Sequence, residues 1–220
     1  MTPYTVRPQS RKALAPLSTC PAPSAGRRRM LHGLTALAAT TLAAGCAQIT
    51  HVATGEMVVK DRLVLTLDRP WNQFAAGFGE SATVWTQDGV YVDALRFYVG
   101  LKDGELLAPT PSEPKGTQPL AFRSTMRTAE IVTLFETLFS RGGSTFTLDR
   151  VQPETFAGQN GFRFDFSSIR KIDDVRLRGT GWGAVRNGEL FVITYTAPRL
   201  SFYERNIKSV DSIVASARIR

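Results

Sequence analysis

Residues 175–196 read VRLRGTGWGAVRNGELFVITYT, and this stretch decides the fold. The dipeptide Asn187-Gly188 near its centre favours a type I′ turn, which joins two antiparallel strands. Counting outward from the turn pairs Arg186 with Glu189 and brings further residues together at every second position. These further pairs are Ala184 with Phe191, Trp182 with Ile193, and Thr180 with Tyr195. We therefore predict a long β-hairpin with one largely apolar face.

The opposite face of the hairpin carries glycine at alternate positions, Gly179, Gly181 and Gly183. Glycine weakens a strand unless another group must approach the backbone closely, and a helix packed on this face would satisfy that condition. The chain provides an amphipathic helix after the hairpin, and Ser201 with Glu204 fits a capping box at its start. The apolar stripe of this helix is Tyr203, Ile207, Val210, Val214 and Ala217.

Further strand and helix signals precede the hairpin. Residues 162–166, FRFDF, place three phenylalanines on one face of a strand, and residues 144–151 predict a strand before it. Apolar residues upstream follow the spacing of an amphipathic helix that ends at Gly142-Gly143. These residues are Ile131, Leu134, Phe135, Leu138 and Phe139, after a possible cap at Thr128.

The front half reads as a β-meander. Residues 57–67 predict a strand, and Asp88-Gly89 supplies a turn within a hairpin over residues 83–91. Asp103-Gly104 repeats that signal after residues 95–101. Because both faces of the predicted sheet are apolar, we expect an α+β fold, an antiparallel sheet covered by helices on each side or dimerised on one.

Residues 161–220 resemble the end of the PsbP/Mog1 group. The resemblance rests on the strand GFRFDF, the hairpin around Asn187-Gly188, the exit Thr-Tyr-Thr-Ala-Pro at 194–198, and a closing helix that ends SIVASARI. It implies an α/β/α sandwich with an antiparallel sheet. It also implies a binding or assembly protein rather than an enzyme.

The start of the chain has the layout of a signal peptide. Three arginines at 27–29 precede an apolar stretch over residues 33–44, and small residues follow as far as Cys46. The apolar stretch is too short to span a bilayer permanently. The alternative is an alanine-rich core helix, but alanine, threonine and glycine make a poor core stripe.

Residues 42–46, LAAGC, resemble the bacterial lipobox, in which the cysteine thiol is lipidated. The resemblance implies that residues 1–45 are a cleaved signal peptide. It makes residues 46–56 a lipidated cysteine with a short tether, and residues 57–220 a single globular domain. The membrane is then a partner through the lipid on Cys46.

Arg27-Arg28-Arg29-Met30-Leu31 also resembles the twin-arginine export signal, with Arg27 and Arg28 as the pair. The alternative is a general secretory signal that happens to hold three arginines. Ala47 stands where lipoproteins retained in the inner membrane commonly carry aspartate. The resemblance therefore places the protein on the periplasmic face of the outer membrane.

The charge of the chain argues against nucleic acid as a partner. The formal net charge is +8, from 27 Lys and Arg against 19 Asp and Glu. All the acidic residues lie after residue 46, whereas six basic residues lie before it, so removing residues 1–45 leaves 21 − 19 = +2. The electrostatic case for nucleic-acid binding disappears with the leader.

Cysteine and histidine are too scarce for several kinds of catalytic site. The two cysteines are Cys20 and Cys46, and the two histidines are His32 and His51. A zinc site, a Cys–His pair or a Ser–His–Asp triad therefore lacks members, and we expect no metal, no cofactor and no enzymatic activity. The alternatives are a cell-wall glycan hydrolase built on carboxylates, which needs a close inward-facing Asp/Glu pair, and an oligomeric structural component, which needs a large exposed apolar sheet face.

One candidate site is a cluster of arginines. If the three phenylalanines at 162, 164 and 166 face the side of Val175 and Leu177, then Arg163 and Asp165 share a face with Arg176 and Arg178. Three guanidiniums beside one carboxylate would leave positive charge to receive an anionic glycan, a lipid headgroup or a partner's acidic residue. The alternative is a set of surface ion pairs. The resulting hypothesis is a non-catalytic, lipid-anchored module that binds an envelope protein or anionic ligand.

Overall fold

The computed structural model describes residues 49–74, 81–109 and 119–220. The predicted signal peptide, its arginines Arg27 and Arg28, and the predicted lipidation site Cys46 lie outside these residues. The elements, in chain order, are β1 (Ile49–Val52), β2 (Gly55–Val59), β3 (Leu63–Leu67), β4 (Trp71–Phe74), β5 (Thr83–Thr86), β6 (Ala94–Leu101), α1 (Thr128–Ser140), a 3₁₀ turn (Arg141–Gly143), β7 (Thr145–Phe156), β8 (Gln159–Ile169), β9 (Arg176–Arg186), β10 (Glu189–Pro198), α2 (Phe202–Ala215) and β11 (Arg218–Ile219).

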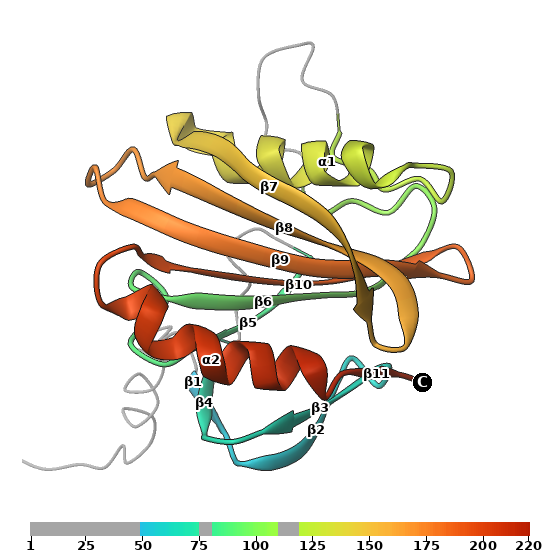
Figure 1. Cartoon of the computed structure of the whole chain (residues 1–220), viewed down its shortest axis with the longest axis horizontal. Coiled ribbons are helices and arrows are strands. Elements are labelled where there is room, and N and C mark those ends of the chain that lie inside the picture. Colours follow the sequence, from blue (N-terminus) through green and yellow to red (C-terminus); the bar gives the residue numbers. More distant parts are fainter. Residues whose placement is uncertain (1–48, 75–80, 110–118) are drawn as a thin grey trace, which may run out of the picture. The chain divides into compact units, whose positions relative to one another are not determined.

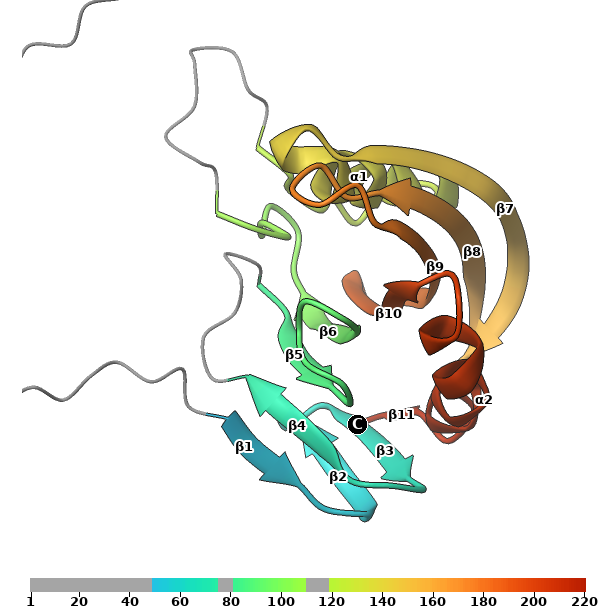
Figure 2. The same ribbon diagram turned by 90° about the vertical axis from the view of Figure 1, so that its left-hand side faces the viewer.

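The strands form two antiparallel sheets (Figure 1). The large sheet has the order β1-β4-β5-β6-β10-β9-β8-β7, and a small sheet has the order β11-β3-β2. Helices α1 and α2 lie on opposite faces of the large sheet, which curls around α1 (Figure 2). This confirms the predicted α+β class with helices on both faces.

The β9–β10 hairpin forms as the sequence predicts. Asn187 and Gly188 take positive φ values of 53° and 78°, as a type I′ turn requires. All four predicted cross-strand pairs are present, from Arg186 opposite Glu189 to Thr180 opposite Tyr195. The apolar face of this hairpin is buried from Thr180 to Ala184 on β9 and from Phe191 to Tyr195 on β10.

The alternating glycines accommodate phenylalanine rings, not the terminal helix. Across the β8–β9 pair, Gly179 lies opposite Phe166 and Gly181 opposite Phe164, and a Cβ at either glycine would overlap that ring. Helix α1 then covers the rings, with Phe139 stacked on Phe166 at 5.2 Å between centroids. The expectation that α2 packs on the glycine face was therefore wrong, because the phenylalanines of the neighbouring strand fill that space first.

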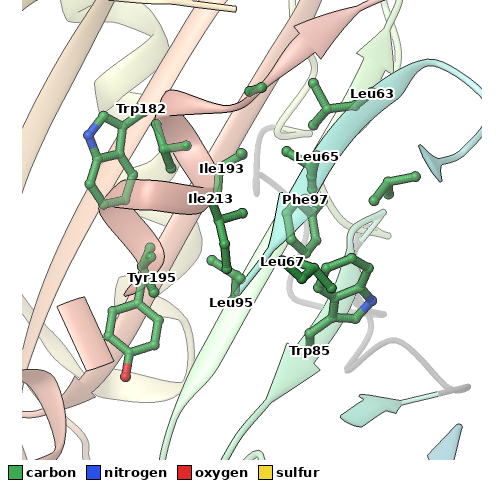
Figure 3. Close-up of a cluster of buried hydrophobic side chains, with 14 of the residues drawn as sticks. Leu63, Leu65, Leu67, Trp85, Leu95, Phe97, Trp182, Ile193, Tyr195 and Ile213 are labelled. Atoms are coloured by element: carbon green, nitrogen blue, oxygen red, sulfur yellow. The ribbon is translucent and has the colours of Figure 1, made fainter. Parts of the chain in front are cut away.

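Helix α2 instead covers the other face of the large sheet (Figure 3). Ile213 of α2 packs in one cluster with Trp182 and Ile193 of the hairpin and with Leu65 of the small sheet. The cluster is closed off from solvent, since Ile213, Ile193 and Leu65 have no exposed surface. This core therefore joins the hairpin, α2 and the small sheet.

The beginning of the domain differs from the prediction. Residues 49–52, assigned to the tether, form β1, and β2 begins at Gly55. β1 pairs with β4 through its backbone, and its Val52 is buried in the core. The single strand expected over residues 57–67 is a hairpin, because Lys60 and Asp61 take left-handed backbone conformations between β2 and β3.

Two local predictions also need correction. The β5–β6 hairpin exists, but its loop runs from 87 to 93 because the carboxylate of Asp93 accepts bonds from Thr86 Oγ1 and from the amides of Gln87 and Asp88. The capping box before α2 does not form. Ser201 has φ 71° and makes no side-chain cap.

An ion pair joins the small sheet to the β9–β10 hairpin, and we predict a pH-dependent loss when it is removed. Arg62 Nη2 lies 2.6 Å from Glu189 Oε2, and this bond lowers the pKa of Glu189 below its ordinary 4.5. A carboxyl whose pKa falls on folding stabilises the protein above its unfolded pKa, and this stabilisation is lost as the pH falls.

Glu189→Gln should therefore lower the free energy of unfolding by about 1 kcal/mol at neutral pH, since the pair is partly screened by solvent. In urea titrations the difference from the wild type should shrink as the pH falls below the ordinary pKa of glutamate and should vanish only below the lowered pKa of folded Glu189. The exposed Glu136→Gln is the matched control and should show no change at either pH. A Glu189→Gln deficit that persists in acid would show that the loss is not electrostatic.

Candidate binding surface at one end of the sheet

The structure places the three predicted arginines on one face of the sheet. Arg163 shares that face with Trp182, its cross-strand partner, and Arg178 and Arg176 follow along β9 opposite Ser167 and Ile169. The predicted register is thus present. The charges around each arginine, however, are different.

Arg163 is matched by two carboxylates. Its Nη2 lies 3.3 Å from Asp165 Oδ1, its Nη1 lies 3.9 Å from Asp211 Oδ1, and its guanidinium stacks 5.2 Å from the Trp182 ring. Asp211 comes from α2, so the sequence register of the strands could not reveal it. No positive charge is left over at Arg163.

Arg178 is matched as well. Its Nη1 donates to Glu204 Oε1 at 2.8 Å, and its guanidinium lies 4.8 Å above the Tyr203 ring. Glu204 is the residue expected to complete the capping box, and it pairs with the strand instead. Arg178 therefore fixes the first turn of α2 against β9.

Arg176 is the predicted arginine whose positive charge is not balanced by a carboxylate. Within the described residues it makes no ion pair, and it lines two adjoining surface hollows with Arg199. The hollows measure about 320 and 480 Å³. Arg199 also has no ion pair in the described part of the chain, and its amide donates to Arg176 O at 2.9 Å. Sequence reasoning missed Arg199 because it lies in the connection between β10 and α2.

Three loops lie at the end of the large sheet where β9 begins, residues 87–93, 170–175 and 199–201, and we call this the loop end (Figure 1). Residues of the last two loops line the larger hollow. Arg170 joins the first two loops, because its Nη1 donates to Tyr91 O at 2.7 Å. Its remaining N–H groups bind the carboxylate of Asp173 within its own loop. Arg205 of α2 pairs with Asp88, which ties the helix start to the first loop.

The loop end also carries the most exposed large apolar side chains of the described residues. Ile172 is 86% exposed, Leu200 is 82% exposed and Tyr91 is 73% exposed. Each stands in a different loop. Unpaired arginines beside protruding apolar side chains make this end suited to binding rather than to packing within the domain.

A second cavity, of about 200 Å³, lies between α1 and the sheet beside the loop end. Arg96 lines it, donates to Thr196 Oγ1 at 2.9 Å and lies 5.7 Å from the Phe139 ring. Asp93 also lines it, and burial raises the pKa of this carboxyl although Thr86 and two backbone amides favour the ionised form. This small cavity is therefore lined by both a guanidinium group and a carboxyl group.

Carboxylates do gather at one further hollow, of about 370 Å³, near the C-terminal part of α2. Glu154 and Asp211 line it together with Arg163. Burial raises the pKa of Asp211 despite the attraction of Arg163. The Asp211 side chain is nevertheless 47% exposed.

Within the described residues, no group of three or more His, Cys, Asp or Glu side chains is arranged to hold a metal ion. In the same part of the chain, no helix is both long and apolar enough to cross a membrane.

Comparison with known proteins supports the fold. No protein-family model and no curated protein matches the chain. Among solved structures, the chain is similar to cyanobacterial PsbP from Synechocystis sp. PCC 6803, with a TM-score of 0.51 and 11% identity over 82% of this chain and 98% of that one. This likeness shows a PsbP-like fold, as the resemblance in residues 161–220 implied.

A looser likeness is to LpqN, a protein involved in cell envelope biogenesis in Mycobacterium tuberculosis. It has a TM-score of 0.32 and 12% identity over 78% of this chain and 90% of that one. A TM-score at this level carries no weight for fold or function.

Proposed function

We propose that this chain is a non-catalytic lipoprotein of the bacterial envelope that binds an anionic partner through its loop end. The observation that carries the binding function is that Arg176 and Arg199 line one hollow with the protruding Leu200, and that the protruding Ile172 lies in the loop just before Arg176. Of the predicted cluster, the proposed site keeps only Arg176, the arginine without an ion pair. It adds Arg199, which the sequence did not single out.

The anchoring part of the proposal rests on the leader. Residues 42–46 supply a lipobox, and the first strand begins at Ile49, three residues beyond Cys46. Arg27 and Arg28 provide a twin-arginine pair for export in the folded state. Because Ala47 and not aspartate follows the cysteine, we place the protein on the periplasmic face of the outer membrane.

A carboxylate-based glycan hydrolase is the alternative, and Asp211 with Glu154 would be its pair. A proton donor in such an enzyme works from a protected site that keeps its carboxyl protonated. Asp211 is half exposed and ion-paired with Arg163, which leaves it in contact with both solvent and a cation. The geometry therefore favours binding. The oligomeric alternative needed a large apolar sheet face, and in the described residues α1 and α2 cover the two faces.

Metabolic labelling tests the anchor. Cells supplied with a palmitate analogue should label the wild-type protein, whereas Cys46→Ser should carry no label and should leave the membrane fraction, because several acyl chains are needed for lasting attachment. Wild-type protein should float with the outer membrane and Ala47→Asp with the inner membrane. Label on Cys46→Ser would refute the anchor.

A further inference from the structure

The loop end is built from side chains suited to the surface of a phospholipid bilayer. We infer that it docks on an anionic bilayer, with Ile172 and Leu200 entering the headgroup region and Arg176 and Arg199 contacting lipid phosphates. The inference rests on the proposed function, because it names the anionic partner of the same surface.

The apolar contribution comes from two side chains at the tips of separate loops. Ile172 lies in the β8–β9 connection and Leu200 in the β10–α2 connection. Both are more than four-fifths exposed, so neither contributes to the core of the domain. Apolar side chains that protrude singly from a basic surface gain free energy at the boundary between headgroups and acyl chains.

The charges at this end favour an anionic surface. Lys171, Arg176 and Arg199 are exposed and make no ion pair in the part of the chain that the structure describes, and Asp174 is the exposed carboxylate beside them. Asp93 of the loop 87–93 is buried and accepts hydrogen bonds from Thr86 and two backbone amides. The other charges are held in pairs: Arg170 with Asp173, Arg178 with Glu204, and Arg205 with Asp88. Three unpaired cations against one carboxylate leave positive charge facing outward.

The course of the chain keeps this end near the membrane. Ile49 of β1 is the cross-strand partner of Phe74 in β4, and Phe74 is the partner of Val84 in β5. Val84 in turn pairs with Arg96, the third residue of β6. Because β6 begins where the loop 87–93 ends, Ile49 lies about 7 Å along the strand direction from that end. The three chain steps from Cys46 to Ile49 span at most about 10 Å. A lipidated Cys46 would therefore put the bilayer at the same end of the sheet as the loop end, although β1 and β9 are five strands apart in the sheet.

A bilayer fits this surface better than a folded protein partner. A stable protein interface buries about 800 Å² on each side around a packed apolar centre. The loop end offers separate protruding side chains around open hollows. A fluid bilayer can receive side chains at independent positions. The lipid anchor also gives the bilayer a high effective concentration near the domain.

The unacylated domain, residues 47–220, isolates docking from anchoring. It contains every residue of both cores, which extend from Val52 to Ala217, and it lies within the compact unit over residues 45–220. Cosedimentation with vesicles of phosphatidylcholine containing phosphatidylglycerol should detect binding. Vesicles of phosphatidylcholine alone should bind far less, and raised salt should weaken binding because it screens the arginines.

Variants at the loop end should weaken this binding without unfolding the domain. Arg176→Ala with Arg199→Ala should reduce partitioning about 25-fold, about fivefold for each cation removed from an anionic surface. Ile172→Ser with Leu200→Ser should reduce it at least about tenfold. Asp174→Asn should strengthen it about fivefold.

Two control pairs match these changes elsewhere on the surface. Arg123→Ala with Arg150→Ala removes the same charge from two exposed arginines that make no ion pair in the described residues, and Leu148→Ser with Val151→Ser removes exposed apolar side chains from β7. Both pairs should bind vesicles like the wild type, and all variants should melt within a few degrees of it.

Several outcomes would overturn the inference. These are no preference for anionic vesicles, equal losses in the control and loop-end variants, or loop-end variants that change the oligomeric state in sedimentation and leave vesicle binding intact. The last result would identify a second copy of the chain as the occupant. Because the domain carries no lipid, failure here is distinguishable from failure of Cys46 labelling, which tests the anchor alone.

Discussion

Gly181→Ala should lower the free energy of unfolding by about 3 kcal/mol, the upper part of the range for overpacked cores. The added Cβ would overlap the ring of Phe164, which has no exposed surface. The ring cannot withdraw, because Phe135 of α1 lies against it with 5.7 Å between centroids. Urea unfolding monitored by circular dichroism measures the loss.

A second substitution tests the stated cause. Gly181→Ala combined with Phe164→Leu should lose less stability than the sum of the two single losses, because the smaller side chain makes room for the methyl group. Strictly additive losses, or a Gly181→Ala protein as stable as the wild type, would show that ring and glycine are not in contact as described.

Ile213→Ala should cost about 3 kcal/mol, within the range for deleting a large aliphatic side chain from a core. Ile213 is fully buried and joins α2 to both sheets, so the cavity cannot close without moving several elements. Ile172→Ala is the matched control, since Ile172 is 86% exposed and its loss should change stability by no more than about 0.5 kcal/mol. Equal losses at the two positions would contradict the placement of either residue.

The sequence predicted the back half of the domain well because strong local signals lie there. Asn187-Gly188 determines a turn type and therefore a register, and the alternation in residues 162–166 fixes which side chains share a face. The first strands were missed for the opposite reason. β1 has four residues and one buried side chain, Val52, so it is too short to show a clear alternation.

The candidate site was predicted only in part. The shared face of Arg163, Arg176 and Arg178 follows from strand register, but the partners of two of them, Asp211 and Glu204, belong to α2. Which face a helix covers depends on long-range packing, and here the phenylalanine rings of β8 exclude α2 from the glycine face. Periodicity within α2 carries no information about that competition.

The loop end left only a faint signal in the sequence. Ile172 and Leu200 are apolar residues in otherwise polar connections, and apolar residues in loops are common enough to pass unnoticed. Their meaning appears once the fold brings Leu200 beside Arg176 and Arg199 and leaves Ile172 exposed in the neighbouring loop. Solvent exposure distinguishes these two residues from other apolar loop residues, and exposure is known only for the folded chain.

Mass spectrometry of tryptic peptides from protein purified from membranes tests the central claim, a lipid-anchored domain, most directly. The account predicts that the first peptide spans residues 46–60 and carries acyl chains on Cys46, with no peptide from the leader. Recovery from the same membranes of the peptide over residues 13–27, together with an unmodified Cys46, would contradict it.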